Sequence, residues 1–181
     1  MIRLDRFQND DFDRGASRFK EAIWILTKRL FFQSRFPWPS KLKACLLRVF
    51  GAKVGRGLVI RPRVNISFPW KLSVGDHVWI GEETLILSLS YVKIGSHVCI
   101  SQRAFICTGS HDFRAETFDM KTGPIRIEDS SWIAAQAFIG RDVTIGTGSV
   151  VSAGSVVLKD VLPGTVVRGN PAEPVKQLLP E

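Results

Sequence analysis

The stretch that decides the fold runs from residue 127 to residue 157 and reads IEDSSWIAAQAFIGRDVTIGTGSVVSAGSVV. A β-branched aliphatic residue returns at every sixth position in it, and the same interval occurs upstream. An α-helix of 3.6 residues per turn cannot keep one face in step with a period of six. A short fixed repeat of this kind predicts a hexapeptide parallel β-helix, in which three hexapeptides form one triangular coil, so we expect an all-β solenoid of about five coils. Fifteen residues, which we call anchors, carry the interval: Val54, Ile60, Ile66, Val74, Ile80, Ile86, Ile94, Ile100, Ile106, Ile127, Ile133, Ile139, Ile145, Val151 and Val157.

Two further positions of the repeat support this prediction. The residues four places after an anchor are small or β-branched, which suits the interior of a narrow triangular core. Glycine directly follows several anchors, and we expect corners there with backbone angles that other residues avoid. The first set is Val78, Thr84, Val98, Ala104, Ser131, Ala137, Val143, Ser149, Ser155 and Val161, and the second is Gly55, Gly75, Gly81, Gly95, Gly140 and Gly146.

The six-residue interval is interrupted in three places. Two extra residues enter after Ile66, two more after Ile86, and fifteen after Ile106. The last insertion must leave the solenoid as a loop, which we place at residues 107–126. A loop of this length in a tight repeat is usually functional.

The segment before the solenoid has a helical rhythm instead. Apolar side chains at helical spacing predict one amphipathic helix after residue 17, and a second that begins near Ser40 and ends at Gly51. We therefore divide the chain into a basic amphipathic helical segment (1–53), the solenoid with its loop (54–165) and a C-terminal tail (166–181).

Positive charge is concentrated in the first third of the chain. Residues 1–65 carry fifteen Lys and Arg against five Asp and Glu, whereas the rest of the chain carries ten against twelve. The cations alternate with apolar residues such as Trp24, Phe31 and Phe36, a mixture that suits an anionic bilayer surface better than nucleic acid. The alternative is that these apolar faces cap the first coil, which every solenoid must protect. We expect capping, with peripheral membrane contact in addition and no nucleic-acid partner.

Composition bounds the class of protein. The chain has 181 residues and a mean hydropathy near zero, as expected for one globular domain. Its longest apolar stretch is interrupted by Lys28 and Arg29 and falls short of the roughly 20 residues that a transmembrane helix needs. Three cysteines without metal or redox spacing favour a reducing compartment. We therefore expect a cytoplasmic protein, with contact at the inner face of the cell membrane.

His111 is the candidate catalytic residue. It lies in the long loop, and histidine is the side chain best suited to proton transfer near neutral pH. The alternative is an ordinary surface histidine, but its place in the one long insertion favours function. His77 and His97 each follow an anchor by three residues in neighbouring coils, so we expect them to stack about 4.8 Å apart. Three imidazoles can hold zinc, but because His111 sits five residues after its anchor we expect no metal.

Other candidates for substrate contact lie close to the loop in the repeat pattern. Trp132 directly precedes an anchor and can face a neighbouring subunit, a cleft or solvent. Glu82, Glu83 and Asp112 are acidic candidates for orienting His111, and their spacing does not choose among them. We assign Trp132, Glu83 and Asp112 to the substrate site.

The sequence resembles a known family. The segment from Ile127 to Ala172, together with CTGSHDF around His111, the ISQ at residues 100–102 and FPWKLSVGDHVWIGE upstream, is similar to hexapeptide-repeat acetyltransferases. It resembles in particular the O-acetyltransferases of colanic acid biosynthesis type, from about Phe31 almost to the end of the chain. The resemblance implies a left-handed coil, a homotrimer and acetyl-CoA bound in the groove between two subunits.

The same resemblance implies roles for individual residues. His111 would be the general base on an acceptor hydroxyl, with backbone N–H groups near Ala134 and Ala135 holding the oxyanion and Trp132 near the acceptor. The residues that would contact coenzyme A are Ala135, Ala153, Leu158, Lys159 and Lys176. Glu173 stands where the family often has a basic residue, so Lys159 and Lys176 would contact the phosphates instead.

These observations favour an enzyme that moves an acetyl group from acetyl-CoA to a sugar hydroxyl in exopolysaccharide or surface-glycan biosynthesis. Its acceptor is a saccharide, including one linked to a lipid. Two alternatives remain open at this stage, namely a zinc-dependent hydratase like the γ-carbonic anhydrases, which share the repeat, and a non-catalytic scaffold that binds glycan or membrane.

Overall fold

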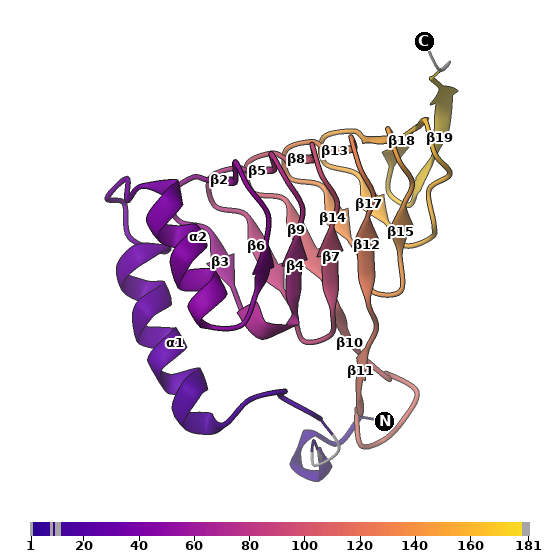
Figure 1. Ribbon diagram of the computed structural model, residues 1–181. Helices are drawn as coiled ribbons and strands as arrows, with labels where there is room; N and C mark the ends of the chain where they lie inside the picture. Colours follow the sequence, from indigo (N-terminus) through magenta and orange to yellow (C-terminus); the bar gives the residue numbers. More distant parts are fainter. Residues whose placement is uncertain (1, 8, 10–11, 179–181) are drawn as a thin grey trace.

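A computed structural model describes residues 2–7, 9 and 12–178 (Figure 1). Two helices lie at one end of a stack of triangular coils, and a hairpin projects from the stack near its middle. The elements outside the coils are the 3-10 turns η1 (Leu4–Arg6) and η2 (Pro69–Lys71), the helices α1 (Arg18–Phe31) and α2 (Ser40–Val49), and the hairpin strands β10 (Gly109–His111) and β11 (Met120–Thr122).

Three parallel sheets, here called faces A, B and C, form the walls of the solenoid. Face A contains β1 (Lys53–Val54), β4 (Leu72–Val74), β7 (Val92–Ile94), β12 (Ile125–Ile127) and β15 (Thr144–Ile145). Face B contains β2 (Val59–Ile60), β5 (Trp79–Ile80), β8 (Cys99–Ile100), β13 (Trp132–Ile133), β16 (Val150–Val151), β18 (Thr165–Gly169) and the antiparallel β19 (Ala172–Gln177). Face C contains β3 (Asn65–Ile66), β6 (Leu85–Leu87), β9 (Phe105–Cys107), β14 (Phe138–Ile139) and β17 (Val156–Val157).

The six-residue interval predicted this core correctly. Anchors of successive coils pair in register, as in the series Ile60, Ile80, Ile100, Ile133 and Val151 on face B. All the anchors are buried except Val54, in the first coil, which is half-buried. The predicted small or β-branched residues four places after the anchors are all buried as well. Five complete coils result, followed by a partial sixth that Val161 and β18 begin.

The corners of the coils correct one expectation. The six glycines that follow anchors do not have the left-handed backbone angles that we expected there. That conformation occurs two residues later, at positions such as His77 and Glu83, with φ of 55° and 60°. The glycines are required by close packing between coils instead, since a Cβ on Gly75 would lie 2.7 Å from the carbonyl carbon of Gly95.

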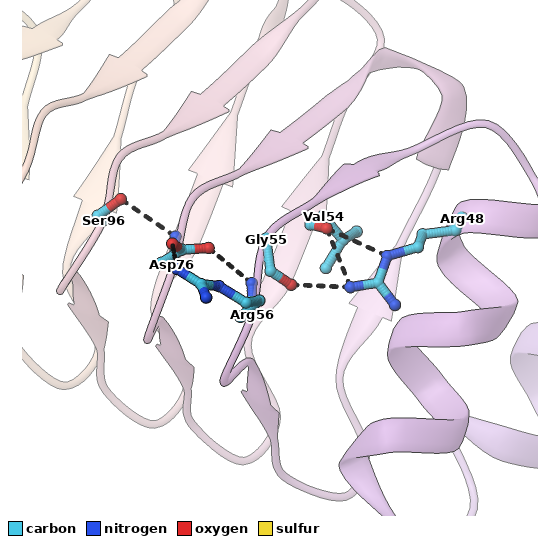
Figure 2. A network of polar contacts seen from close by, with 6 residues as sticks. All are labelled: Arg48, Val54, Gly55, Arg56, Asp76 and Ser96. Carbon is cyan, nitrogen blue, oxygen red and sulfur yellow. Dashed lines mark hydrogen bonds and ion pairs between the residues drawn. The ribbon is translucent and has the colours of Figure 1, made fainter.

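The two helices cap the first coil, as expected. Each edge strand of that coil has backbone groups with no preceding strand to pair with, which is a liability in any sheet. Arg48 of α2 donates to the carbonyl oxygens of Val54 and Gly55 at 2.8–3.1 Å, as Figure 2 shows for face A. On face C, the indole N–H of Trp24 donates to Ile66 at 3.0 Å.

Face B is capped by two residues of α2. The Ser40 hydroxyl accepts from the Ile60 N–H at 3.0 Å. The ammonium of Lys43, fully buried, donates to the carbonyl oxygens of Ile60 and Arg61 at 3.2 Å each. Burial lowers the pKa of Lys43 below its usual value. All three faces are therefore capped by side chains of the helical segment.

A side-chain ladder links the coils at the corner that follows face A. The carboxylate of Asp76 accepts from the Arg56 N–H at 2.7 Å, and the Ser96 hydroxyl accepts from the Asp76 N–H at 3.1 Å (Figure 2). Asp129 repeats the contact with the Ser96 N–H at 2.7 Å. The hydrogen bond from the Arg56 backbone is the main reason that the pKa of Asp76 lies below its usual value.

The three interruptions of the repeat all fall at the corner between face C and face A, and there they stack. The Ser88 hydroxyl bridges the backbone N–H and C=O of Phe68, one coil earlier. In the next coil, the Thr108 hydroxyl donates to the Leu87 carbonyl oxygen and accepts from the Ser90 N–H. The insertions therefore form one continuous column on a single edge of the solenoid, and the β10–β11 hairpin extends from its third member.

The C-terminal segment, expected as a tail, forms the β18–β19 hairpin that extends face B. Among the described residues, no helix has the length and apolar character needed to cross a bilayer.

The cap predicts a measurable stability effect. Lys43→Met keeps most of the side-chain volume but removes the buried ammonium that donates to the carbonyl oxygens of Ile60 and Arg61 in the first coil. We expect it to lower the free energy of unfolding by about 1–3 kcal/mol, measured by urea denaturation. Lys41→Met, on the exposed side of the same helix, is the matched control and should leave stability nearly unchanged; equal losses in both variants would contradict the role of Lys43.

Candidate active site

His111 ends strand β10 of the projecting hairpin and pairs with Met120 of β11. Its Nδ1 lies 2.9 Å from the carbonyl oxygen of Phe118. A carbonyl can only accept a hydrogen bond, so Nδ1 carries the proton in the neutral ring and the lone pair of Nε2 is left free to accept one. This is the tautomer that a general base requires.

Aromatic rings hold the imidazole in place. The Phe118 ring stacks on it in parallel, with centroids 4.2 Å apart and an interplanar angle of 2°. Phe118 has a φ of 51°, a left-handed conformation that is unusual for a bulky residue and typical of functional sites. Phe7, from the start of the chain, approaches the same ring at 5.8 Å.

Asp112 does not touch His111 through any hydrogen bond of the described structure. Its carboxylate forms an ion pair with Lys121 at 2.7 Å and accepts from the Arg114 N–H at 3.0 Å. The hydrogen bond from Lys121 is the first cause of the lowered pKa of Asp112. The residue therefore braces the hairpin across its two strands, and the Phe118 carbonyl is the group that orients His111.

A pocket of about 580 Å³ lies beside the hairpin, against the column of insertions. Because cross-strand partners share one face of a hairpin, Met120 links this pocket to His111. Lys71 is almost fully buried in its wall, where its ammonium donates to Leu89 at 2.7 Å and to Asp13. The residues that line the pocket come from the N-terminal segment, the two short insertions and the hairpin: Asn9, Phe12, Asp13, Lys71, Leu89, Ser90, Tyr91, Asp119, Met120 and Thr122.

Glu83 lies on a different corner, the one between faces B and C. It forms ion pairs with Arg103 at 2.7 Å and with Arg63, which occupy the same position one coil later and one coil earlier. The hydrogen bond from Arg103 is the main cause of its lowered pKa. Glu82 lines a shallow pocket of about 250 Å³ at this corner, together with Ala135.

Trp132 points outward from face B, in the same column as Trp79. It is 48% exposed, and its indole N–H donates to the Ser101 hydroxyl at 2.9 Å. Within one chain, Trp132 therefore lies on a different face from the hairpin that carries His111.

His77 and His97 stack, as expected, with ring centroids 5.3 Å apart. They line a pocket of about 480 Å³ with Trp79 and Cys99, away from the hairpin. Within residues 2–7, 9 and 12–178, no three or more His, Cys, Asp and Glu side chains are grouped so as to hold a metal ion.

The residues assigned to coenzyme A fall in three places. Ala135 and Ala153 occupy the same corner in successive coils, where the Gly154 N–H donates to Ala135 at 2.9 Å. Leu158 lines a pocket of about 390 Å³ at the base of the hairpin, next to Lys159 in sequence. Lys176 is on β19, opposite Val166.

One expectation about the oxyanion donors requires correction. The Ala134 N–H donates to the Val151 carbonyl at 2.9 Å as part of the parallel ladder, so it is not available. Within the described residues the Ala135 N–H has no such backbone partner. Of the two amides, only Ala135 is free to stabilise an oxyanion.

Comparison with known proteins places this geometry in a family. Residues 124–159 match the family described as bacterial transferase hexapeptide (six repeats). The putative colanic acid biosynthesis acetyltransferase WcaF of Escherichia coli (strain K12) is 40% identical over 168 residues, which cover 91% of this chain and 90% of that protein. The chain belongs to the hexapeptide-repeat acetyltransferases.

Solved structures agree with this assignment. The hexapeptide-repeat-containing acetyltransferase VCA0836 of Vibrio cholerae O1 biovar eltor, in its complex with acetyl coenzyme A, is 30% identical with a TM-score of 0.80, and the match covers 97% of each chain. Galactoside O-acetyltransferase of Escherichia coli (strain K12) is 28% identical over 83% of this chain and 77% of that protein. The fold is thus the left-handed parallel β-helix of acetyltransferases, and the chain is an enzyme that transfers an acetyl group.

Several residues of this candidate site have no signal in the sequence of the acetyltransferase. The pocket residues Phe12, Lys71 and Tyr91 belong to no motif, and Phe118 is one of several apolar residues in the long loop. A usable signal existed for part of the pocket, because Lys71 and Tyr91 lie in the two short interruptions of the repeat. Phe7 gave no signal, since nothing in its surroundings relates it to a loop a hundred residues later.

Proposed function

We propose that this enzyme transfers the acetyl group of acetyl-CoA to a hydroxyl of a saccharide in exopolysaccharide or surface-glycan biosynthesis. The observation that carries the proposal is His111, held with Nδ1 on the Phe118 carbonyl and next to a polar pocket. The similarity to a putative colanic acid biosynthesis acetyltransferase supports the class of acceptor.

In the proposed mechanism, Nε2 of His111 takes the proton of the acceptor hydroxyl as its oxygen attacks the thioester carbonyl. The carbon–oxygen bond forms, the oxyanion is held by the Ala135 N–H of the neighbouring subunit in the trimer proposed below, and the carbon–sulfur bond then breaks. The proton passes from the imidazolium to the departing coenzyme A thiolate. General-base assistance of this kind contributes about 10²–10⁴-fold, and one preorganised oxyanion donor contributes a comparable factor.

The pocket of about 580 Å³ is the proposed acceptor site. Saccharides present both hydroxyl groups and apolar ring faces, and the pocket offers partners for both. Asn9, Ser90 and Thr122 supply polar groups, whereas Phe12 and Tyr91 supply aromatic rings. Of the residues first assigned to the substrate, we give Asp112 and Glu83 supporting roles, because their carboxylates are held by Lys121 and by two arginines.

We propose a homotrimer for this enzyme on the basis of its outward side chains. Faces B and C present mostly apolar columns, with Trp79 and Trp132 on one and Phe105 and Phe138 on the other. Face A instead presents charged and polar groups, including Lys93. Two adjacent apolar faces suit a ring in which face B of each subunit packs on face C of the next.

This packing brings separated candidates together. The β10–β11 hairpin leaves the solenoid at the end of face C, so the neighbour's face B would lie beside it. Trp132 of that neighbour would then reach the acceptor site of His111. Acetyl-CoA is proposed to occupy the groove between the two subunits, along Ala135, Ala153 and Leu158, with Lys159 and Lys176 near its phosphates.

We also propose that the enzyme is cytoplasmic and binds the inner face of the cell membrane through α1. One side of this helix packs Trp24 into the core, whereas the opposite side leaves a line of apolar residues exposed: Phe19 (76%), Ile23 (40%), Leu26 (67%) and Leu30 (56%). Arg18 and Arg29 are exposed on the same helix. This pattern suits an anionic bilayer, near lipid-linked acceptors.

The role of His111 is tested by His111→Ala. We expect acetyl transfer from acetyl-CoA to members of a panel of methyl hexopyranosides, followed as thiol release and acetylated sugar, to fall about 10²–10⁴-fold. His77→Ala, a histidine at a corner away from the hairpin, is the matched control and should retain activity. Full activity in His111→Ala would exclude it as the base.

The trimer is tested by a charge placed on face B. Trp132→Arg should prevent assembly, because an arginine would be desolvated against an apolar face, and sedimentation should show single chains with lost activity. Thr144→Arg adds the same cation to the outward column of face A and should remain trimeric and active. A wild-type protein that sediments as one chain would refute the proposal.

Membrane binding is tested on α1 without removing it, since deletion would also remove the cap. The triple variant Phe19→Ser, Leu26→Ser and Leu30→Ser should lose most of its co-sedimentation with phosphatidylserine vesicles, and salt should weaken wild-type binding. Leu162→Ser, an equally exposed residue at the other end of the solenoid, is the control. Undiminished binding by the triple variant would contradict the proposal.

A further inference from the structure

The first described residues of the chain contact the catalytic hairpin. We call Ile2–Phe7 the N-terminal arm. The Arg3 N–H donates to the Glu116 carbonyl oxygen at 2.8 Å, and the Arg6 guanidinium pairs with the Glu116 carboxylate at 2.9 Å. In Figure 1 the start of the chain lies beside the β10–β11 hairpin. The arm therefore belongs, in space, to the active site.

The arm ends at the imidazole of His111. The Phe7 ring lies 5.8 Å from the imidazole centroid at an angle of 60°. Phe118 already covers one face of the imidazole in parallel at 4.2 Å, so Phe7 must approach from another side. The short turn η1 (Leu4–Arg6) sets this geometry, because it places Arg6 on Glu116 and the next residue on the imidazole.

We propose that the N-terminal arm is a working part of the catalytic site, in which Phe7 positions His111 and keeps water from it. This inference rests on the proposed role of His111 as the base. Acetyl-CoA is a thioester, and a base that activates a hydroxyl also activates water. Water would then form the carbon–oxygen bond, the carbon–sulfur bond would break, and acetate and coenzyme A thiol would result. A transferase avoids this loss by shielding its base until the acceptor is bound.

The attachment of the arm suits such a shield. The Arg6–Glu116 pair is about half exposed at both partners, and exposed pairs of this kind are weak and sensitive to salt. None of the residues of η1 is buried. The arm is thus held by surface contacts and can lift from the hairpin without disrupting the core, which admits the acceptor to the pocket beneath.

The test measures acetyl-CoA hydrolysis without acceptor, so its probe is acetyl-CoA alone. Phe7→Ala should raise hydrolysis about 2- to 12-fold, the range expected for loss of one aromatic contact, and should lower transfer to the sugar panel. Phe7→Leu, which restores an apolar side chain, should restore the low hydrolysis. Phe36→Ala removes an aromatic side chain that is 59% exposed and lies outside the arm; it is the matched control and should match wild type.

A second set of variants tests the attachment. Arg6→Glu should raise hydrolysis of acetyl-CoA, as Phe7→Ala does. Adding Glu116→Arg should restore the wild-type value, because the ion pair can form again with its charges reversed. Arg18→Gln removes an exposed cation of α1 outside the arm, and should have no effect on hydrolysis.

The double variant Phe7→Ala, His111→Ala separates this inference from the proposed function. If the extra hydrolysis disappears in it, water is activated through His111 and the proposal is supported. If Phe7→Ala leaves hydrolysis unchanged while His111→Ala abolishes transfer, His111 stands as the base and the role of the arm is refuted. If His111→Ala keeps full transfer, the base assignment fails and the arm proposal fails with it.

Discussion

The in-register stacking of successive coils is the constraint on which the rest of this structure depends. Each strand is only two or three residues long in most coils and is too short to be stable alone. It forms its hydrogen bonds with the strands of the preceding and following coils, and the same contacts bury its anchor. An insertion or deletion of one residue within a strand would shift its register and turn anchors such as Ile100 outward. Extra residues are therefore tolerated only at corners, where they leave the sheets undisturbed.

The position of the candidate active site follows from this constraint. All three insertions fall at the corner between faces C and A, so their side chains stack on one edge instead of scattering around the solenoid. The two short insertions supply the wall of the pocket, and the long one supplies His111. The regular coils hold the candidate site, and the irregular corner carries the residues to which we assign its chemistry. The basic N-terminal segment closes the arrangement at two points, through the cap on the first coil and the arm on the hairpin.

Much of the fold was predictable because its signal is local and repeated. The anchors, the small interior residues and the stacking of His77 on His97 all follow from a fixed interval. The structural role of the glycines after anchors was predicted wrongly, because the sequence shows that a residue is small but not which atoms of the next coil approach it. His111 could be proposed as a candidate because a histidine in the one long insertion stands out. Phe7, Phe118 and Lys71 could not, because their roles depend on contacts between distant segments that carry no shared pattern.

The position of the cap has a consequence for how this chain is made. Ribosomes release the N-terminus first, so α1 and α2 are available before any coil exists. Lys43, Arg48 and Trp24, which cap the first three strands, are therefore synthesised before the strands that they cap. The exposed edge of the first coil can be covered as soon as that coil leaves the ribosome.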